Sequence, residues 1–294
     1  MKLSFVGIPI YTLAKYRGMS EAVTNLRSAG ILSRLRSADP NLVDLGDVDC
    51  PRIEADLGSK TLHNFDEFLE GTRKVREKLV KGIDGTRLTF LLGGECSFIV
   101  GSTAALKIVH KGHPGIVWMD AHGDYNTPET TDSGFIGGMC LAMACGRGPR
   151  LTSELEAARP LLDPEYVVHI GSRSLDPGED KALESNVKLI TAKQVKKDGI
   201  GKVARQTAKH VNDSCDWIIA HLDVDVFDPS VMSSVDFPEP GGLRDYDILT
   251  IFRELHKTGK INAIDLTAYN PNLDKDGRGR SFLLDIAPKL VATE

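Results

Sequence analysis

The sequence of 294 residues predicts an α/β fold, with three layers in which a mostly parallel sheet is flanked by helices. Two observations carry this prediction. Short runs rich in Val, Ile and Leu alternate with amphipathic stretches along the chain, which is typical of βαβ units. These runs are apolar throughout, as expected for strands that are buried on both faces of a parallel sheet.

Five apolar runs have the length of strands and are flanked by turn residues: Leu88–Leu92, Gly115–Met119, Tyr166–Ile170, Trp217–Leu222 and Ile261–Leu266. A first strand is expected to end near Gly7 and Pro9, because both residue types interrupt strands. Four amphipathic stretches are expected as helices: Glu21–Arg36, Phe65–Val80, Ser97–Val109 and Tyr246–Lys257. For the last helix, Asp245 is the expected N-cap and Gly259 the expected stop.

Composition excludes several classes of protein. A hydrophobic content of 41% is enough for one large core, and we expect a single domain over residues 1–294. The net charge of -5 argues against nucleic-acid binding, and no apolar run approaches the roughly 20 residues of a membrane span. The five cysteines are odd in number and include no C-x-x-C pair, which favours a cytoplasmic protein without disulfides.

The unusual polar motifs all follow expected strands. They are GGECS (Gly93–Ser97), DAHGDYN (Asp120–Asn126), GSRSLDPGE (Gly171–Glu179), DVDVFDP (Asp223–Pro229) and AYNP (Ala268–Pro271). In parallel α/β sheets, ligands bind outside the carboxyl ends of the strands. We therefore expect these five segments to meet at one edge of the sheet and to form one site.

Two of these motifs predict a metal centre. In extended chain, Asp120, His122 and Asp124 would point to one side, and Asp223 and Asp225 would do the same on another strand. Crowded carboxylates repel each other, and hard divalent cations such as Mn²⁺ remove that cost. Two such ions would balance four carboxylates. A helix-capping or turn role explains a single Asp, but it explains D-x-H-x-D together with D-x-D poorly.

The motifs resemble those of the arginase/agmatinase (ureohydrolase) family. DAHGDYN resembles its D-A-H-x-D signature, HLDVDVFDP its S-x-D-x-D-x-x-D-P signature, and GGECS its G-G-D-H-S segment. The resemblance implies a homo-oligomer, a trimer or hexamer, with two Mn²⁺ ions and a metal-bridging hydroxide that attacks a guanidinium carbon. It also implies that Asp120 and Asp223 bridge the ions. Asp124 would complete one metal position, and His122 with Asp225 the other.

Cys96 departs from the family pattern, because the resemblance places the first histidine ligand of the family at this position. A thiolate ligand would favour Zn²⁺, Fe²⁺ or Ni²⁺ over Mn²⁺. The alternative is that Cys96 is a small buried residue with no metal role. The sequence leaves both interpretations open.

Three further departures affect the substrate. The resemblance places a proton-shuttling histidine at Gly137, a substrate-contacting asparagine at Phe135, and a guanidinium-binding glutamate at Ala268. A cationic guanidinium in a partly dry site needs a carboxylate partner. We therefore expect a nitrogenous small molecule as the substrate and no efficient arginase activity.

Other positions retain family features. Four residues match positions that face the amino-acid end of the substrate in arginases: Asn126, Ser133, Asp176 and Glu179. Ser174 stands where the family has an acidic residue, so this recognition is incomplete. Four aromatic residues are candidates either for the pocket wall or for the core: Tyr125, Phe135, Phe237 and Tyr269.

His221 and Asp124 are the expected catalytic residues. His221 lies two residues before Asp223 and should point to the same side of its strand. We expect it to support the ligands instead of binding metal itself, and it could also replace the missing proton relay. His113 and His169 are expected to be surface or core histidines.

Three functions remain in competition. The leading one is a binuclear metallohydrolase that cleaves a C–N bond in an amidino or related compound. The second is a mononuclear zinc hydrolase acting on an amide, with His122, Asp225 and one shared Asp as ligands. The third is a non-catalytic, arginase-like binding or structural protein. The retention of five of six expected ligands argues against the third, although two expected catalytic helpers are missing.

Overall fold

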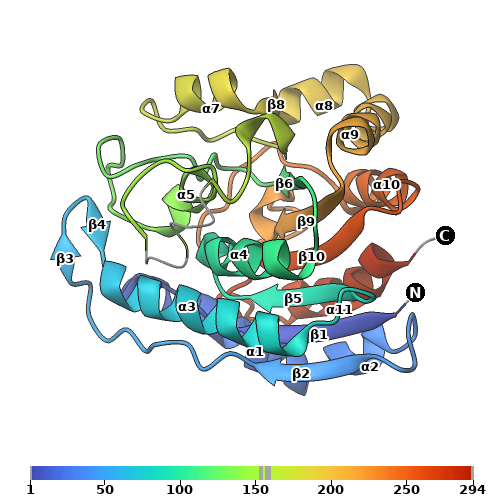
Figure 1. Cartoon of the computed structure of the whole chain (residues 1–294), viewed down its shortest axis with the longest axis horizontal. Coiled ribbons are helices and arrows are strands. Elements are labelled where there is room, and N and C mark those ends of the chain that lie inside the picture. Colours follow the sequence, from blue (N-terminus) through green and yellow to red (C-terminus); the bar gives the residue numbers. More distant parts are fainter. Residues whose placement is uncertain (1, 152–154, 156–159, 293–294) are drawn as a thin grey trace.

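A computed structural model describes residues 2–151, 155 and 160–292 of the protein, and it centres on an eight-stranded sheet (Figure 1). The strand order is β2-β1-β5-β10-β9-β6-β7-β8, and each neighbouring pair is parallel. The strands are β1 (Leu3–Ile8), β2 (Val43–Asp47), β5 (Leu88–Gly93), β6 (Pro114–Met119), β7 (Val167–Ile170), β8 (Lys188–Ile190), β9 (Trp217–Asp223) and β10 (Ile261–Thr267). A separate antiparallel pair joins β3 (Gly58–Ser59) to β4 (Leu62–His63).

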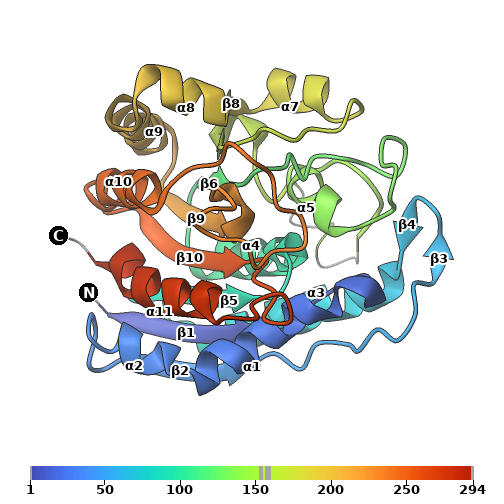
Figure 2. The same ribbon diagram turned by 180° about the vertical axis from the view of Figure 1, so that it is seen from behind.

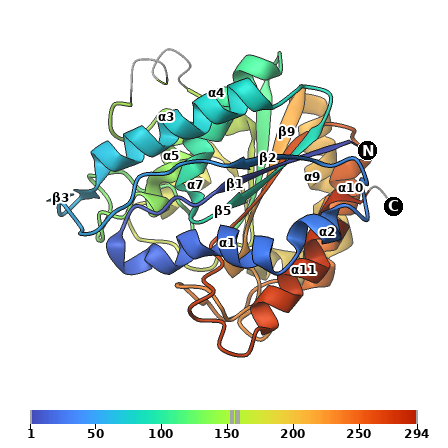
Figure 3. The same cartoon turned by 90° about the horizontal axis from the view of Figure 1, so that it is seen from below.

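Helices cover both faces of the sheet and complete three layers (Figures 2 and 3). One face packs against α3 (Phe65–Gly82), α4 (Ile99–Val109), α5 (Cys140–Ala144) and α7 (Asp180–Asn186). The other packs against α1 (Glu21–Ser28), α2 (Ile31–Leu35), α8 (Ala192–Asp198), α9 (Ile200–Ser214), α10 (Asp245–His256) and α11 (Arg278–Val291). The two faces hold separate hydrophobic clusters, as expected for a sheet whose strands are buried on both sides.

The predicted fold class is confirmed, and the five predicted apolar strands match β5, β6, β7, β9 and β10 within one or two residues. The predicted helix Glu21–Arg36 is wrong as one element, because Gly30 adopts φ 92° and divides it into α1 and α2. The last predicted helix begins at Asp245 itself, with Arg244 as its N-cap. Gly259 follows its end with φ 67°, as expected for a helix stop.

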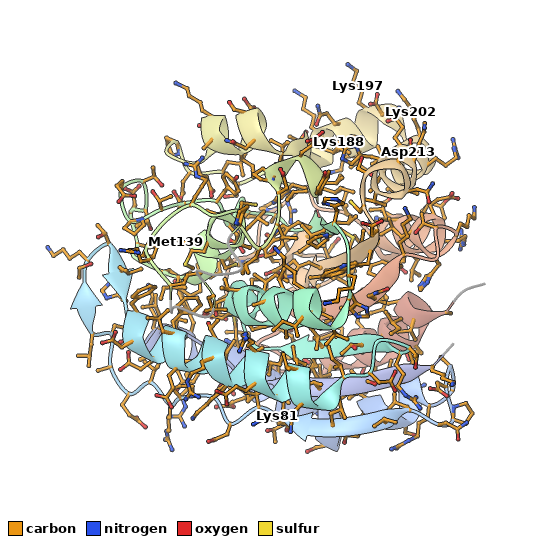
Figure 4. All side chains as sticks on the ribbon, viewed as in Figure 1. Lys81, Met139, Lys188, Lys197, Lys202 and Asp213 are labelled. Carbon is orange, nitrogen blue, oxygen red and sulfur yellow. The ribbon has the colours of Figure 1, made fainter. Side chains whose placement is uncertain are left out.

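The two edge strands, β2 and β8, escape prediction because they lack a buried apolar run. β2 is mostly exposed, and two of its carboxylates, Asp44 and Asp47, pair with Arg27. β8 has three half-buried residues. Figure 4 shows Lys197 and Lys202 projecting outward at this end of the molecule, around α8 and α9. Among the described residues, no helix combines the length and apolarity needed to span a membrane.

Candidate metal centre and pocket

Loops after five neighbouring strands enclose a cavity of about 330 Å³ at the carboxyl edge of the sheet. The loops follow β5, β10, β9, β6 and β7, so the five segments predicted to meet do meet. The loop after β5 is tightly packed, which explains why glycine is needed there. A Cβ atom on Gly94 would lie 2.1 Å from the carbonyl oxygen of Ile10, which leaves room only for glycine.

Asp120 and His122 are positioned by the turn that follows β6. Asp120 is buried, and its Oδ2 accepts a hydrogen bond from the Trp118 indole at 2.9 Å. Its Oδ1 accepts one from the backbone N–H of His122 at 2.7 Å. The His122 ring reaches back so that Nδ1 lies 3.0 Å from Asp225 Oδ2. Burial opposes protonation of this ring, but Asp225 and Asp120 raise the pKa of His122 to about 12.

Asp223 and Asp225 follow a similar pattern after β9, but not in the extended geometry that the sequence predicted. Residues Val224–Val226 form a 3-10 turn, and Asp223 Oδ1 accepts the backbone N–H of Asp225 at 2.7 Å. Asp124 also lies outside a strand, with φ 49°. The strict alternation of side chains is therefore wrong, because the chain turns at the end of each strand. The turns nevertheless bring all five predicted side chains to the cavity wall.

The crowding of these carboxylates fits divalent cations. Burial and the neighbouring carboxylates raise the pKa values of Asp124 and Asp223 well above the ordinary range. Burial acts in the same direction on Asp225, but His122 overcomes it and holds the pKa of Asp225 below its usual value. Deprotonating all four acids in this space requires added positive charge. Oxygen, imidazole and sulfur donors together suit Mn²⁺, Fe²⁺ or Zn²⁺.

Cys96 lies within this cluster at the start of the short turn before α4. Its Sγ donates to Asp223 Oδ2 at 2.9 Å and lies 3.2 Å from Thr267 Oγ1. Burial and Asp223 raise the pKa of the Cys96 thiol. A thiol this close to a carboxylate would lose its proton if it bound a cation, because the metal ligand is the thiolate. Its position therefore suits the ligand role that the sequence left open.

A second thiol, which the sequence did not single out, lies on the other side of the cluster. Cys140 Sγ is 3.7 Å from Asp124 Oδ2, at the start of α5. The main-chain carbonyl of Asp124 also accepts the N–H groups of Leu141 and Ala142, at 3.0 and 3.2 Å. These contacts tie the left-handed conformation of Asp124 to α5.

His221 lies beneath the cavity instead of on its wall. Its ring is fully buried and stacks on the Trp118 indole, with centroids 3.5 Å apart. The residues that line the cavity do not include it. This place does not suit a proton relay to substrate, and it brings the ring close to Cys96 and Asp120.

The four predicted substrate-contacting residues all line the cavity: Asn126, Ser133, Asp176 and Glu179. Asn126 Nδ2 donates to Asp176 Oδ2 at 2.8 Å. Glu179 accepts the backbone N–H groups of Tyr125 and Asp176, at 2.9 and 3.1 Å. Burial raises the pKa of Glu179 to about 7, although these amides act in the opposite direction.

Aromatic rings form one side of the pocket and leave no room for a side chain at Gly137. A Cβ atom on Gly137 would lie 2.4 Å from the Phe135 ring, so that ring occupies the space of a side chain at residue 137. Tyr16 lies against both Phe135 and Phe237, with ring centroids 5.2 and 4.9 Å apart. Phe135 and Phe237 line the cavity, whereas the other two aromatic candidates, Tyr125 and Tyr269, are buried away from it.

The cavity is strongly acidic, and several of its carboxylates were missed from the sequence. Its acidic lining residues are Glu95, Asp120, Asp124, Asp132, Asp176, Glu179, Asp223, Asp225, Asp236 and Glu239. None of the described lining residues is lysine or arginine. The missed residues are Glu95, Asp132, Asp236 and Glu239. Glu95 stands in the GGECS segment, where no role was assigned to it, and the other three lie in loops without a spacing motif. A cavity of this charge favours cations.

Glu95 differs from the other missed residues because one of its oxygens is unused. Its side chain is buried, and Oε2 accepts the backbone N–H of Thr12 at 3.0 Å. Oε1 makes no hydrogen bond of good geometry among the described residues. Burial raises the pKa of Glu95 to about 7, although the side chains of Ser97 and Thr12 and the Thr12 N–H act in the opposite direction. Ala268 lies beside it in the structure, since the Ala268 N–H donates to the Gly94 carbonyl at 2.7 Å.

Nearly the whole chain is similar to known proteins of one family. The profile of the Arginase family matches residues 1–291. The arginase of Bacillus subtilis (strain 168) is 32% identical over 290 residues, covering 98% of this chain and 97% of that protein. The structure of arginase from Bacillus caldovelox aligns with a TM-score of 0.93 at 29% identity, covering 100% and 99% of the two chains. Formimidoylglutamase from Bacillus subtilis shares the fold, with a TM-score of 0.76 at 17% identity over 98% of this chain and 85% of that one.

Proposed function

Because the chain belongs to the arginase family and is a ureohydrolase-like hydrolase, we propose that it cleaves a C–N bond in a cationic guanidino or amidino compound, with bound divalent metal ions. We also propose that arginine is a poor substrate. The observation that carries the proposal is the acidic cavity, which combines a metal-ligand cluster with additional carboxylates and lacks lysine and arginine among its described lining residues.

Different residues of the cavity would bind the metal ions and contact the substrate. Asp120, Asp124, His122, Asp223 and Asp225 would hold the ions, with Cys96 beside them. Bound ions would supply an activated water at neutral pH and polarise the substrate. The Phe135 and Phe237 rings would exclude water from one side of the reacting group and favour a flat, planar cation.

Glu95 would hold the cationic group of the substrate. A buried carboxylate oxygen without a hydrogen-bond partner is costly, and a guanidinium or amidinium N–H would satisfy it. Glu95 is adjacent to the position where the resemblance places the guanidinium-binding glutamate, now Ala268. The carboxylate would thus come from the loop after β5 instead of the loop after β10.

Arginine fits this pocket less well for two reasons. Ala268 supplies no carboxylate, and Phe135 fills the space in which a histidine at residue 137 would stand. Asn126 is expected to contact the amino-acid end of arginine, but its amide already makes hydrogen bonds within the protein, with Asp176 and Thr130. A shorter or less polar guanidino or amidino compound would suit the pocket better.

Replacing Glu95 by glutamine tests this assignment. Glu95→Gln should lower kcat/KM for cationic guanidino and amidino substrates by about 10- to 100-fold, since hydrogen bonds to charged groups contribute about 1.5–3 kcal/mol. Turnover of a neutral amide by the same protein should change much less. The measurement is steady-state kinetics on guanidinobutyrate, agmatine, formiminoglutamate and a simple amide.

Glu95→Asp is the matched control, because it keeps the charge and shortens the reach. It should recover part of the lost activity towards cations. Equal losses for cationic and neutral substrates in Glu95→Gln would contradict the assignment, and so would undiminished kcat/KM for the cations.

A further inference from the structure

A row of buried polar side chains crosses the sheet one layer below the carboxylate cluster. Asp265 of β10 pairs with His221 of β9, His221 with Trp118 of β6, and Trp118 with His169 of β7. All four side chains are fully buried. Because side chains alternate along a strand, Asp120 and Asp223 lie two residues further on, on the same face. The row therefore forms the floor of the metal cluster.

His221 is held in one orientation within this row. Its Nδ1 lies 2.8 Å from Asp265 Oδ1, and its ring lies nearly parallel to the Trp118 indole, at an interplanar angle of 13°. Neither carboxylate oxygen of Asp265 makes a hydrogen bond among the described residues, so the contact with His221 is its nearest polar interaction given by the structure. Nδ1 is thus close to a carboxylate, but neither ring nitrogen of His221 makes a hydrogen bond among the described residues. A buried imidazole nitrogen of this kind calls for a ligand.

We propose that His221 is a metal ligand, which forms a nitrogen–sulfur–oxygen site with Cys96 and Asp120. A ring nitrogen of His221, Cys96 Sγ and an Asp120 oxygen all lie within 4.8 Å of one another. Bonds of about 2.0–2.3 Å to one central ion would span such a group with little movement. Asp223, 2.9 Å from Cys96 Sγ, is placed to supply a fourth donor.

The arrangement has the features of a metal-bound histidine. Ligating histidines usually have a carboxylate beside their other ring nitrogen, which orients the ring, and Asp265 lies in this place. The donor set is softer than an all-oxygen site, so it favours Zn²⁺, Fe²⁺ or Co²⁺ over Mn²⁺.

The inference also accounts for two departures from the family pattern at once. The resemblance places histidine at Cys96 and serine at His221, the first position of the S-x-D-x-D signature. In this chain the imidazole is thus lost from the loop after β5 and regained from the floor of the site on β9. The two positions would exchange roles without a change in the number of nitrogen ligands.

The inference rests on the proposed metal dependence, and Co²⁺ binding to the full-length protein tests it. His221→Gln should weaken Co²⁺ binding by more than about 100-fold, beyond the usual effect of a residue that only orients a ligand. In proton NMR spectra of the Co²⁺-loaded protein, a paramagnetically shifted, exchangeable imidazole resonance should disappear. The matched control is His169→Gln, which removes another buried imidazole from the same row and should leave both readouts unchanged.

A variant that restores the family residues at both positions should gain affinity for Mn²⁺. The double variant Cys96→His/His221→Ser should lose the thiolate-to-cobalt absorption band and bind Mn²⁺ more tightly relative to Zn²⁺ than the wild type does. An unchanged shifted resonance in His221→Gln, with a loss of affinity below about tenfold, would overturn the ligand assignment but leave metal dependence intact. Failure of the wild type to bind any divalent ion would overturn both.

Discussion

Replacing Asp223 by alanine should leave a folded protein that binds no divalent ion tightly and hydrolyses no substrate. Asp223 is buried at the centre of the cluster, where it contacts Cys96 Sγ and the backbone N–H of Asp225. It is the carboxylate expected to touch both ions. Metal ions supply several kcal/mol of transition-state stabilisation, so we expect kcat/KM to fall by more than about 1,000-fold.

Elemental analysis and calorimetric titration measure the loss of metal directly. Asp236→Asn is the control, because Asp236 also lines the cavity, but its carboxylate bonds Asn270 and lies outside the expected ligand set. That variant should keep its metal content. Full metal stoichiometry in Asp223→Ala would show that the ions bind elsewhere and would contradict the site described here.

The second large effect is a gain of arginine hydrolysis. The triple variant Phe135→Asn/Gly137→His/Ala268→Glu should raise kcat/KM for arginine by about 10³-fold or more. General acid–base catalysis contributes about 10²–10⁴-fold, and a carboxylate partner for the guanidinium adds to it. The assay is urea release from arginine in manganese, zinc and nickel.

The single variant Gly137→His separates steric from chemical effects. Since its Cβ would lie 2.4 Å from the Phe135 ring, it should gain little activity and lose stability until Phe135 is also replaced. Efficient arginine turnover by the wild type, with kcat/KM of about 10⁴–10⁸ M⁻¹s⁻¹, would contradict this interpretation of the pocket.

The central strands and the cluster of Asp and His side chains were accessible from the sequence because local patterns specify them. Continuous apolar runs mark β5, β6 and β9, and the paired Asp motifs that follow β6 and β9 mark the cluster. The edge strands β2 and β8 were not accessible, because partial exposure removes the apolar signal.

The remaining site residues depend on tertiary contacts that no local pattern encodes. Glu95 becomes a candidate for substrate binding only when the loop after β5 is seen to approach Ala268. Asp265 lies in an apolar strand, and its pairing with His221 follows from the register of β10 on β9. The filling of the space at Gly137 by Phe135 is a packing result that alignment of motifs does not reveal.

Metal content and hydrolysis measured on one preparation test the central claim most directly. The protein would be stripped of metal, reloaded with graded amounts of Mn²⁺, Zn²⁺ or Ni²⁺, and assayed on guanidino and amidino compounds. We predict one or two bound ions per chain and C–N bond cleavage that rises in proportion to occupancy. The absence of stoichiometric binding under every loading condition, or equal hydrolysis by the stripped and loaded protein, would contradict it.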